Sequence, residues 1–265
     1  MRYNIEKLRR ALWTFGQPLT KKPKLAGVPV SDLFVWRNSE DWKTFFELTD
    51  IAGLFDDGEG ASSRSVTILF FDSNGNQFLE KRLALLHNQR QTVDFSELLV
   101  ESKSSFGTFC VFHSAPQMIS DIGSFITERG YVSYRYKDAP LRSYVHGSLD
   151  AISLCESTGL TLLGSSSIFP REYRLQHELS GPALYEVAIV NPSSRNQLIA
   201  CQVLSARSGA SLGVQEVQLR PRGSHVFPVQ VEQSQEVRIV INSRLVMARP
   251  FIFRIQEQKM VVFHG

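Results

Sequence analysis

The sequence lacks any long apolar run, and this absence argues against a membrane-spanning protein. No stretch of the 265 residues approaches the ~18 apolar residues that a transmembrane helix needs. The first residues, Met1 to Asn4, lead into mixed charged and apolar residues rather than the apolar core of a signal peptide. We therefore expect a protein without a transmembrane segment, located in the cytoplasm.

Cysteine is also scarce. The three cysteines, Cys110, Cys155 and Cys201, are widely spaced and form no C-x-x-C pair. An odd number at such spacing suits reduced thiols better than a disulfide framework or a zinc knuckle. Cys110 and Cys201 lie in apolar runs typical of strands, so we expect both to be small core residues.

Motifs for cofactor binding and catalysis are missing. The sequence contains no G-x-S-x-G, P-loop or G-x-G-x-x-G motif, and its six histidines show neither H-x-H nor H-E-x-x-H spacing. Asp72–Asn76 begins like a calcium loop, but the twelfth position of such a loop is Leu83 instead of Glu. We expect no cofactor and no metal, and the sequence leaves open whether the protein is an enzyme.

Positive charge is concentrated at the N-terminus. Residues 1–30 contain seven Lys or Arg and one acid, whereas the remaining residues contain 22 bases and 25 acids. Apolar residues recur at helical spacing from Ile5 to Phe15, and Gly16 to Pro18 ends the pattern. We expect a basic helical arm that either packs with a solvated basic face or contacts an anionic partner such as a phosphate-rich molecule or a membrane.

The rest of the chain shows mainly the two-residue period of β-strands. One exception is Ser39–Trp42, which has the form of a helix start and is followed by Phe45, Phe46 and Leu48. Asp72–Asn76 is predicted to be a hairpin turn. Strands are predicted over residues 65–71, 78–86, 92–95, 107–113, 131–136, 143–145, 185–190, 197–205, 216–219, 225–231, 236–242, 251–255 and 260–263.

Four blocks of sequence recur in the same order, which indicates an internal duplication. We predict a mainly β fold of two tandem antiparallel β-sandwich units, preceded by a short helical, basic N-terminal segment. The predicted boundaries are 1–30 for the arm and linker, 31–150 for the first unit, 151–182 for a connector and 183–265 for the second unit. The matched blocks are Val66–Asp72 with Val187–Asn191, Phe106–Ser114 with Gln235–Ser243, Arg129–Tyr131 with Arg249–Phe251, and Tyr144–Gly147 with Val262–Gly265.

Each copy ends in a predicted hairpin whose return strand finishes at His-Gly. In an antiparallel pair the end of the return strand lies opposite the start of the first strand. We therefore expect His146 beside Arg129 and Tyr131, and His264 beside Arg249 and Phe251.

The hairpin of the first copy is rich in Tyr and Arg. Tyrosines stack on sugar rings and arginines bind carboxylate or phosphate, which suits an acidic saccharide or a nucleotide sugar. The alternative is a solvent-facing sheet whose Tyr and Arg pair across strands for stability. A second polar-aromatic cluster lies where the units join. The predicted binding residues are Arg129, Tyr131, Tyr134, Arg135, Arg142, Tyr144, His146, Arg171 and Tyr173.

Three functions are compatible with these patterns. The first is a non-catalytic binding or assembly protein that recognises an anionic or sugar-containing ligand through the Arg129–His146 hairpin, or associates through its sheet edges as a homo-oligomer. The second is an enzyme of carbohydrate or polysaccharide metabolism with His146 as general acid or base. The third is an interaction protein whose basic arm binds a partner. The second copy has Phe251, Ile252 and Phe253 instead of tyrosines, which favours a site in the first copy.

Overall fold

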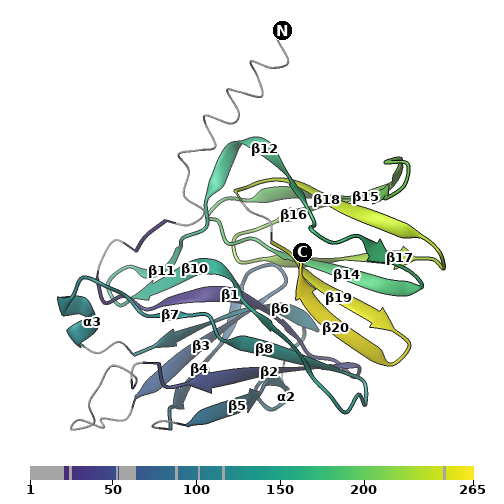
Figure 1. The fold of residues 1–265 in the computed structure, drawn as a ribbon. Helices are drawn as coiled ribbons and strands as arrows, with labels where there is room; N and C mark the ends of the chain where they lie inside the picture. The colour runs from purple at the N-terminus through teal and green to yellow at the C-terminus, as the bar shows by residue number, and fades with distance from the viewer. Residues whose placement is uncertain are drawn as a thin grey trace.

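The computed structural model describes residues 21–23, 26–51, 53, 64–86, 89–100, 102–114, 117–246 and 249–265. The predicted arm helix over 5–15 lies outside these residues. In the described part the chain is mainly β, with its strands arranged in four sheets (Figure 1). Two short helices accompany them, α2 (Phe95–Leu98) and α3 (Gln117–Asp121). No helix among the described residues is long and apolar enough to cross a bilayer.

The N-terminal part, purple to teal in Figure 1, contains two of these sheets. One has the strand order β11-β10-β1-β6-β3-β4, with β7 paired in parallel to β1, and the other has the order β5-β2-β8-β9. The strands are β1 (Val30–Arg37), β2 (Trp42–Thr49), β3 (Ser65–Asp72), β4 (Gln77–Ala84), β5 (Arg90–Asp94), β6 (Phe106–His113), β7 (Thr127–Glu128), β8 (Tyr131–Tyr136), β9 (Ser143–His146), β10 (Ser148–Cys155) and β11 (Gly159–Leu162).

The C-terminal part, green to yellow, contains the other two sheets. Their orders are β12-β18-β15-β16, with β13 also paired to β18, and β17-β14-β19-β20. The strands are β12 (Ser166–Arg174), β13 (Leu179–Ser180), β14 (Ala183–Val190), β15 (Gln197–Ser205), β16 (Ser211–Leu219), β17 (Ser224–Val231), β18 (Glu236–Leu245), β19 (Phe251–Gln256) and β20 (Lys259–His264).

The two parts have the same strand connectivity. The orders β4-β3-β6-β1 and β5-β2-β8-β9 correspond, strand by strand along the chain, to β16-β15-β18-β12 and β17-β14-β19-β20. The register of the last hairpin also agrees, because Tyr131 pairs with His146 and Phe251 pairs with His264. This confirms the predicted position of each histidine in its hairpin. The strands β10 and β11 extend the first sheet beyond the shared pattern.

The predicted strands from residue 65 onward are confirmed, and so is the hairpin turn, where Asp72 Oδ1 accepts hydrogen bonds from the backbone of Asn74 and Asn76. The predicted helix after Ser39–Trp42 is wrong, because residues 42–49 form the central strand β2. Phe45 and Glu47 on its outer face are buried beneath side chains of their own sheet, so the alternation of a half-exposed strand is masked. Residues 151–182 consist mostly of strands β10 to β13, and the chain passes from one part to the other between Leu162 and Ser166.

The sheet β17-β14-β19-β20 is covered on both faces. Alternate residues of β19 point in opposite directions: Ile252 joins the core shared with the sheet β12-β18-β15-β16, whereas Phe251 and Phe253 join the core of the N-terminal part. The ring of Phe253 packs edge-on against Trp42 and Tyr134, at centroid distances of 5.3 and 4.9 Å. The two parts therefore share a continuous apolar contact. The predicted core cysteines, Cys110 and Cys201, are fully buried.

Candidate functional site

The four-stranded sheet of the N-terminal part has one inner and one outer face. On β2, Trp42, Thr44 and Phe46 point inward and are buried, so the alternating residues lie on the outer face. This outer face gathers basic and aromatic side chains from β2, β8 and β9 through the pairs Lys43–Arg135, Phe45–Ser133 and Ser133–Tyr144. Arg90 of β5 adjoins them through its pair with Thr49. We define the basic–aromatic face as Lys43, Phe45, Glu47, Arg90, Tyr131, Arg135, Arg142 and Tyr144.

Arginine side chains on this face pack on aromatic rings. The guanidinium carbon of Arg142 lies 4.7 Å from the centre of the Phe45 ring and 5.6 Å from that of Tyr144. That of Arg135 lies 5.5 Å from the Phe45 ring. Such contacts hold the guanidinium groups in place and leave their N–H groups for a ligand. Tyr131 and Tyr144 are themselves exposed, by 55% and 41%.

One buried carboxylate lies among these cations. Glu47 Oε2 accepts hydrogen bonds from Arg90 Nε at 2.9 Å and Thr92 Oγ1 at 2.8 Å, and Oε1 lies 3.4 Å from Arg142 Nη1. Burial acts to raise the pKa of Glu47, but the hydrogen bonds and the charges of Arg90 and Arg142 outweigh it, so the pKa lies below its usual value. Glu47 therefore remains charged and fixes two arginines, while Lys43 and Arg135 contribute further positive charge.

His146 lies at the junction of the two parts. Its ring is 6.4 Å from that of Tyr131 and 4.8 Å from that of His264, and its carbonyl accepts a hydrogen bond from His264 Nε2 at 2.9 Å. Burial, together with the charge of Arg249, lowers the pKa of His264 to about 4. A neutral His264 that donates to His146 ties the C-terminal strand to β9.

The structure separates the remaining predicted residues. Tyr134 is fully buried and donates its hydroxyl hydrogen to the carbonyl of Val35 at 2.7 Å, so it is a core residue without access to a surface ligand. Arg171 and Tyr173 belong to β12, in a different sheet. The Tyr173 hydroxyl donates a hydrogen bond to the carbonyl of Gly265. Burial raises the pKa of Tyr173.

Sequence reasoning missed Lys43, Phe45, Glu47 and Arg90. The first three lie on β2, which had been predicted as a helix, and Arg90 begins β5. One signal was available: in residues 42–49 charged residues occupy alternate positions, at Lys43 and Glu47, on either side of Phe45. That pattern places all three side chains on one face of a strand.

A small cleft of about 320 Å³ adjoins the basic–aromatic face. It lies where β2 ends and β8 begins, and the predicted residue Arg129 is found here. Its walls include Glu47, Arg90, Arg129 and Tyr131.

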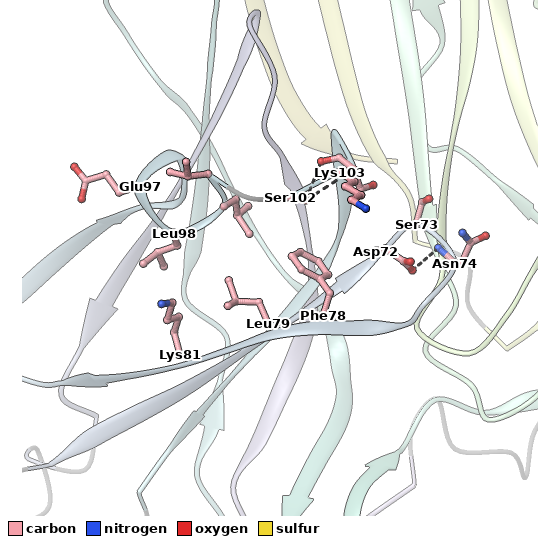
Figure 2. Close-up of a pocket in the computed structure, with 13 residues that line it drawn as sticks. Asp72, Ser73, Asn74, Phe78, Leu79, Lys81, Glu97, Leu98, Ser102 and Lys103 are labelled. Carbon is pink, nitrogen blue, oxygen red and sulfur yellow. Dashed lines mark hydrogen bonds between the residues drawn. The ribbon is translucent and has the colours of Figure 1, made fainter.

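A second cleft, of about 750 Å³, lies between α2 and the β3–β4 hairpin. Figure 2 shows Phe78 and Leu79 between the polar ends of this cleft, with Lys81 and Glu97 at one side and Lys103 at the other. The predicted binding residues do not line it, so it is not the predicted site. Among the residues that the structure describes, no group of three His, Cys, Asp or Glu side chains is arranged to hold a metal ion.

No protein-family model matches the chain, and no curated protein sequence matches it either. Among solved structures, a glycosyl hydrolase family 2 member from Bacteroides cellulosilyticus DSM 14838 shows 5% sequence identity and a TM-score of 0.16. The alignment covers 89% of this chain and 28% of that one, so the chain spans less than a third of that protein's length. A TM-score at this level carries no argument about fold or function.

Proposed function

We propose that the chain is a non-catalytic binding protein that recognises an acidic saccharide through the basic–aromatic face. The observation that supports this is the packing of Arg135 and Arg142 on Phe45 and Tyr144, beside exposed rings. Arginines bind carboxylates in a planar, two-pronged geometry, and tyrosine rings stack on the apolar faces of sugars. A sheet face with exposed tyrosines on neighbouring strands suits an extended chain ligand that contacts several side chains at once.

A comparison of the two parts supports the same surface as the binding site. We propose that the two parts are tandem β-sandwich units that arose by duplication, and the shared connectivity and hairpin register support this. The face of β19 that corresponds to the outer face of β8 carries Phe251 and Phe253, which are covered by the first unit. Of these two matching sheet faces, only the basic–aromatic face has no other unit packed on it, and it can therefore carry charged residues.

The placement of His146 supports a structural role over the catalytic alternative. Its ring packs beside those of Tyr131 and His264, and its carbonyl anchors the C-terminal strand. The imidazole beside it, His264, has its pKa lowered to about 4 by burial and uses its Nε2 hydrogen to bond the carbonyl of His146, so this pair serves the junction between the two parts.

The test is binding of oligogalacturonate, measured by isothermal titration calorimetry at low and high salt, with dextran as the neutral control. We expect binding to oligogalacturonate alone, weakened by salt, and reduced about tenfold or more by Arg135→Ala or Tyr144→Ala.

Matched controls lie on the second unit. Arg174 and Phe169 are also exposed but belong to β12, so Arg174→Ala and Phe169→Ala should leave the affinity unchanged. Equal losses in the control and test variants, or binding that does not change in any of them, would show that the ligand does not use this face.

A further inference from the structure

We infer that the small cleft beside the basic–aromatic face is a subsite for one sugar acid, meaning a single hydroxylated ring that bears a carboxylate. This inference rests on the proposed function and specifies which chemical group the end of the face receives. The cleft has a volume of about 320 Å³, near the lower limit of small-molecule sites, and so suits one ring better than an oligomer.

The cleft combines an aromatic wall with cations. Tyr131 is 55% exposed, and its ring forms a wall on which the apolar face of a sugar can stack. The side chain of Arg90 is 62% exposed although its Nε is bound to Glu47, and Arg129, between β7 and β8, is also exposed. Guanidinium groups at this position favour a ligand carboxylate.

Two buried carboxylates limit the positive charge of the cleft. Glu47 and Glu128 both line the cleft, and both carboxylates are almost wholly buried. Glu128 is held by the backbone N–H of Gly130 and by His113, and Glu47 by Arg90 and Thr92. These fixed negative groups repel a densely charged anion such as phosphate more strongly than a ligand with a single diffuse charge.

Charge balance therefore separates the ligand classes. The two arginines are exposed and the two carboxylates are buried, so a ligand meets the arginines directly, and one diffuse negative charge matches the cleft better than phosphate or a neutral sugar. Gly130 contributes to this shape, because a Cβ there would come within 2.7 Å of Glu128 Oε1.

The test is ligand-observed saturation-transfer NMR on the full chain, with glucuronate as probe, glucose as the neutral analogue and inorganic phosphate as competitor. We expect transfer to glucuronate, little to glucose, and no displacement by phosphate at equal concentration. Tyr131→Ala should reduce the glucuronate signal about tenfold, and Tyr131→Phe, which keeps the ring, should retain it. A glucuronate signal that is absent, that survives Tyr131→Ala, or that phosphate displaces would overturn the inference.

The two proposals fail separately. If oligogalacturonate binds in a manner that depends on Arg135 while glucuronate gives no transfer, the cleft inference is wrong and the face proposal stands. If glucuronate binds in a manner that depends on Tyr131 while oligogalacturonate binding is insensitive to Arg135→Ala, the cleft is a site for the free sugar acid and the face proposal is wrong.

Discussion

The last hairpins of the two parts have the same register and opposite surroundings. In β8–β9 Tyr131 pairs with His146, and in β19–β20 Phe251 pairs with His264. Tyr131 is 55% exposed, whereas Phe251 is completely buried. The same position in the same connectivity therefore carries a polar aromatic residue where the sheet faces solvent and an apolar one where the sheet is covered.

This difference shows that the second part is used as a packing partner for the first. The outer face of β19 contributes Phe251 and Phe253 to the core of the N-terminal part, and Arg37 forms an ion pair with Glu186 of β14 across the same contact. The corresponding face of the first part has no such cover and carries arginines. Burial therefore explains why a tyrosine stands at this position of the first hairpin and a phenylalanine at the matching position of the second.

The most severe test of this comparison truncates the two matched residues. Phe251→Ala should lower the free energy of unfolding by about 3–5 kcal/mol, because it removes a fully buried ring from a close-packed core. Tyr131→Ala should lower it by less than about 1 kcal/mol, because its ring is mostly in solvent already. Urea denaturation followed by circular dichroism measures both. Similar losses at the two positions would contradict the assignment of a covered and an open face.

Acid titration tests the junction through His264. Its pKa is lowered to about 4 in the folded chain, chiefly by burial, whereas an unfolded chain has the usual value of about 6.5. Between these values the unfolded chain binds the proton and the folded chain does not. This contribution to stability is therefore complete above pH 6.5, lost as the pH falls toward 4, and worth up to about 3 kcal/mol.

The matching variant is His264→Gln, which keeps a hydrogen-bond donor for the carbonyl of His146 and cannot be protonated in this range. The free energies of unfolding of the two proteins, measured by urea denaturation between pH 7 and 4, should converge as the pH falls. Only the protein that carries His264 loses this contribution. Parallel curves would mean that His264 titrates in the folded state as it does in a peptide.

Much of the fold was predictable because most strands are buried on one side. Their alternation reveals both the strand and the inward face, as in β15, where the predicted bounds Gln197–Ser205 are those observed. The strand β1 escaped prediction because seven of its eight residues are buried and leave no alternation to detect. β2 was mistaken for a helix for a related reason, since Phe45 and Glu47 on its outer face are also buried, beneath arginine side chains of the same sheet.

The candidate site was only half predictable. Tyr131, Arg135, Arg142 and Tyr144 are close in sequence and share a hairpin, so the sequence alone brings them together. Strands β2 and β5 lie more than 40 positions apart in the chain (Glu47 to Arg90), and only sheet pairing joins them to the hairpin. Tyr134 was misassigned because the pattern did not reveal which face of β8 is turned inward.

A smaller effect is expected on the open face itself. Arg142→Met should lower the free energy of unfolding by about 1 kcal/mol, because Glu47, whose side chain is 5% exposed, loses a neighbouring cation. Arg135→Met is the control, since Arg135 packs on the same Phe45 ring, and it should change stability by less than about 0.5 kcal/mol. Thermal denaturation at low salt distinguishes the two. An equal effect would mean that Glu47 does not depend on Arg142.

The smallest effect on stability is expected at a cysteine. The thiol pKa differs between the open surface, where Cys155 lies, and the covered sheets, where Cys110 and Cys201 lie. Hydrogen bonds from Ser157, and then from Thr158, lower the pKa of Cys155 to about 7, whereas burial raises the pKa of Cys201 to about 12 and that of Cys110 still further. Iodoacetamide at pH 7.5 should therefore modify Cys155 alone in the native protein, as peptide mass spectrometry can show. Ser157→Ala should slow the reaction severalfold by raising the thiol pKa, and Cys155→Ser should leave stability within about 0.5 kcal/mol of the native value. Early modification of Cys201 would instead mean that the sheet containing β15 opens easily. The second part would then be less firmly packed than the burial of Cys201 indicates.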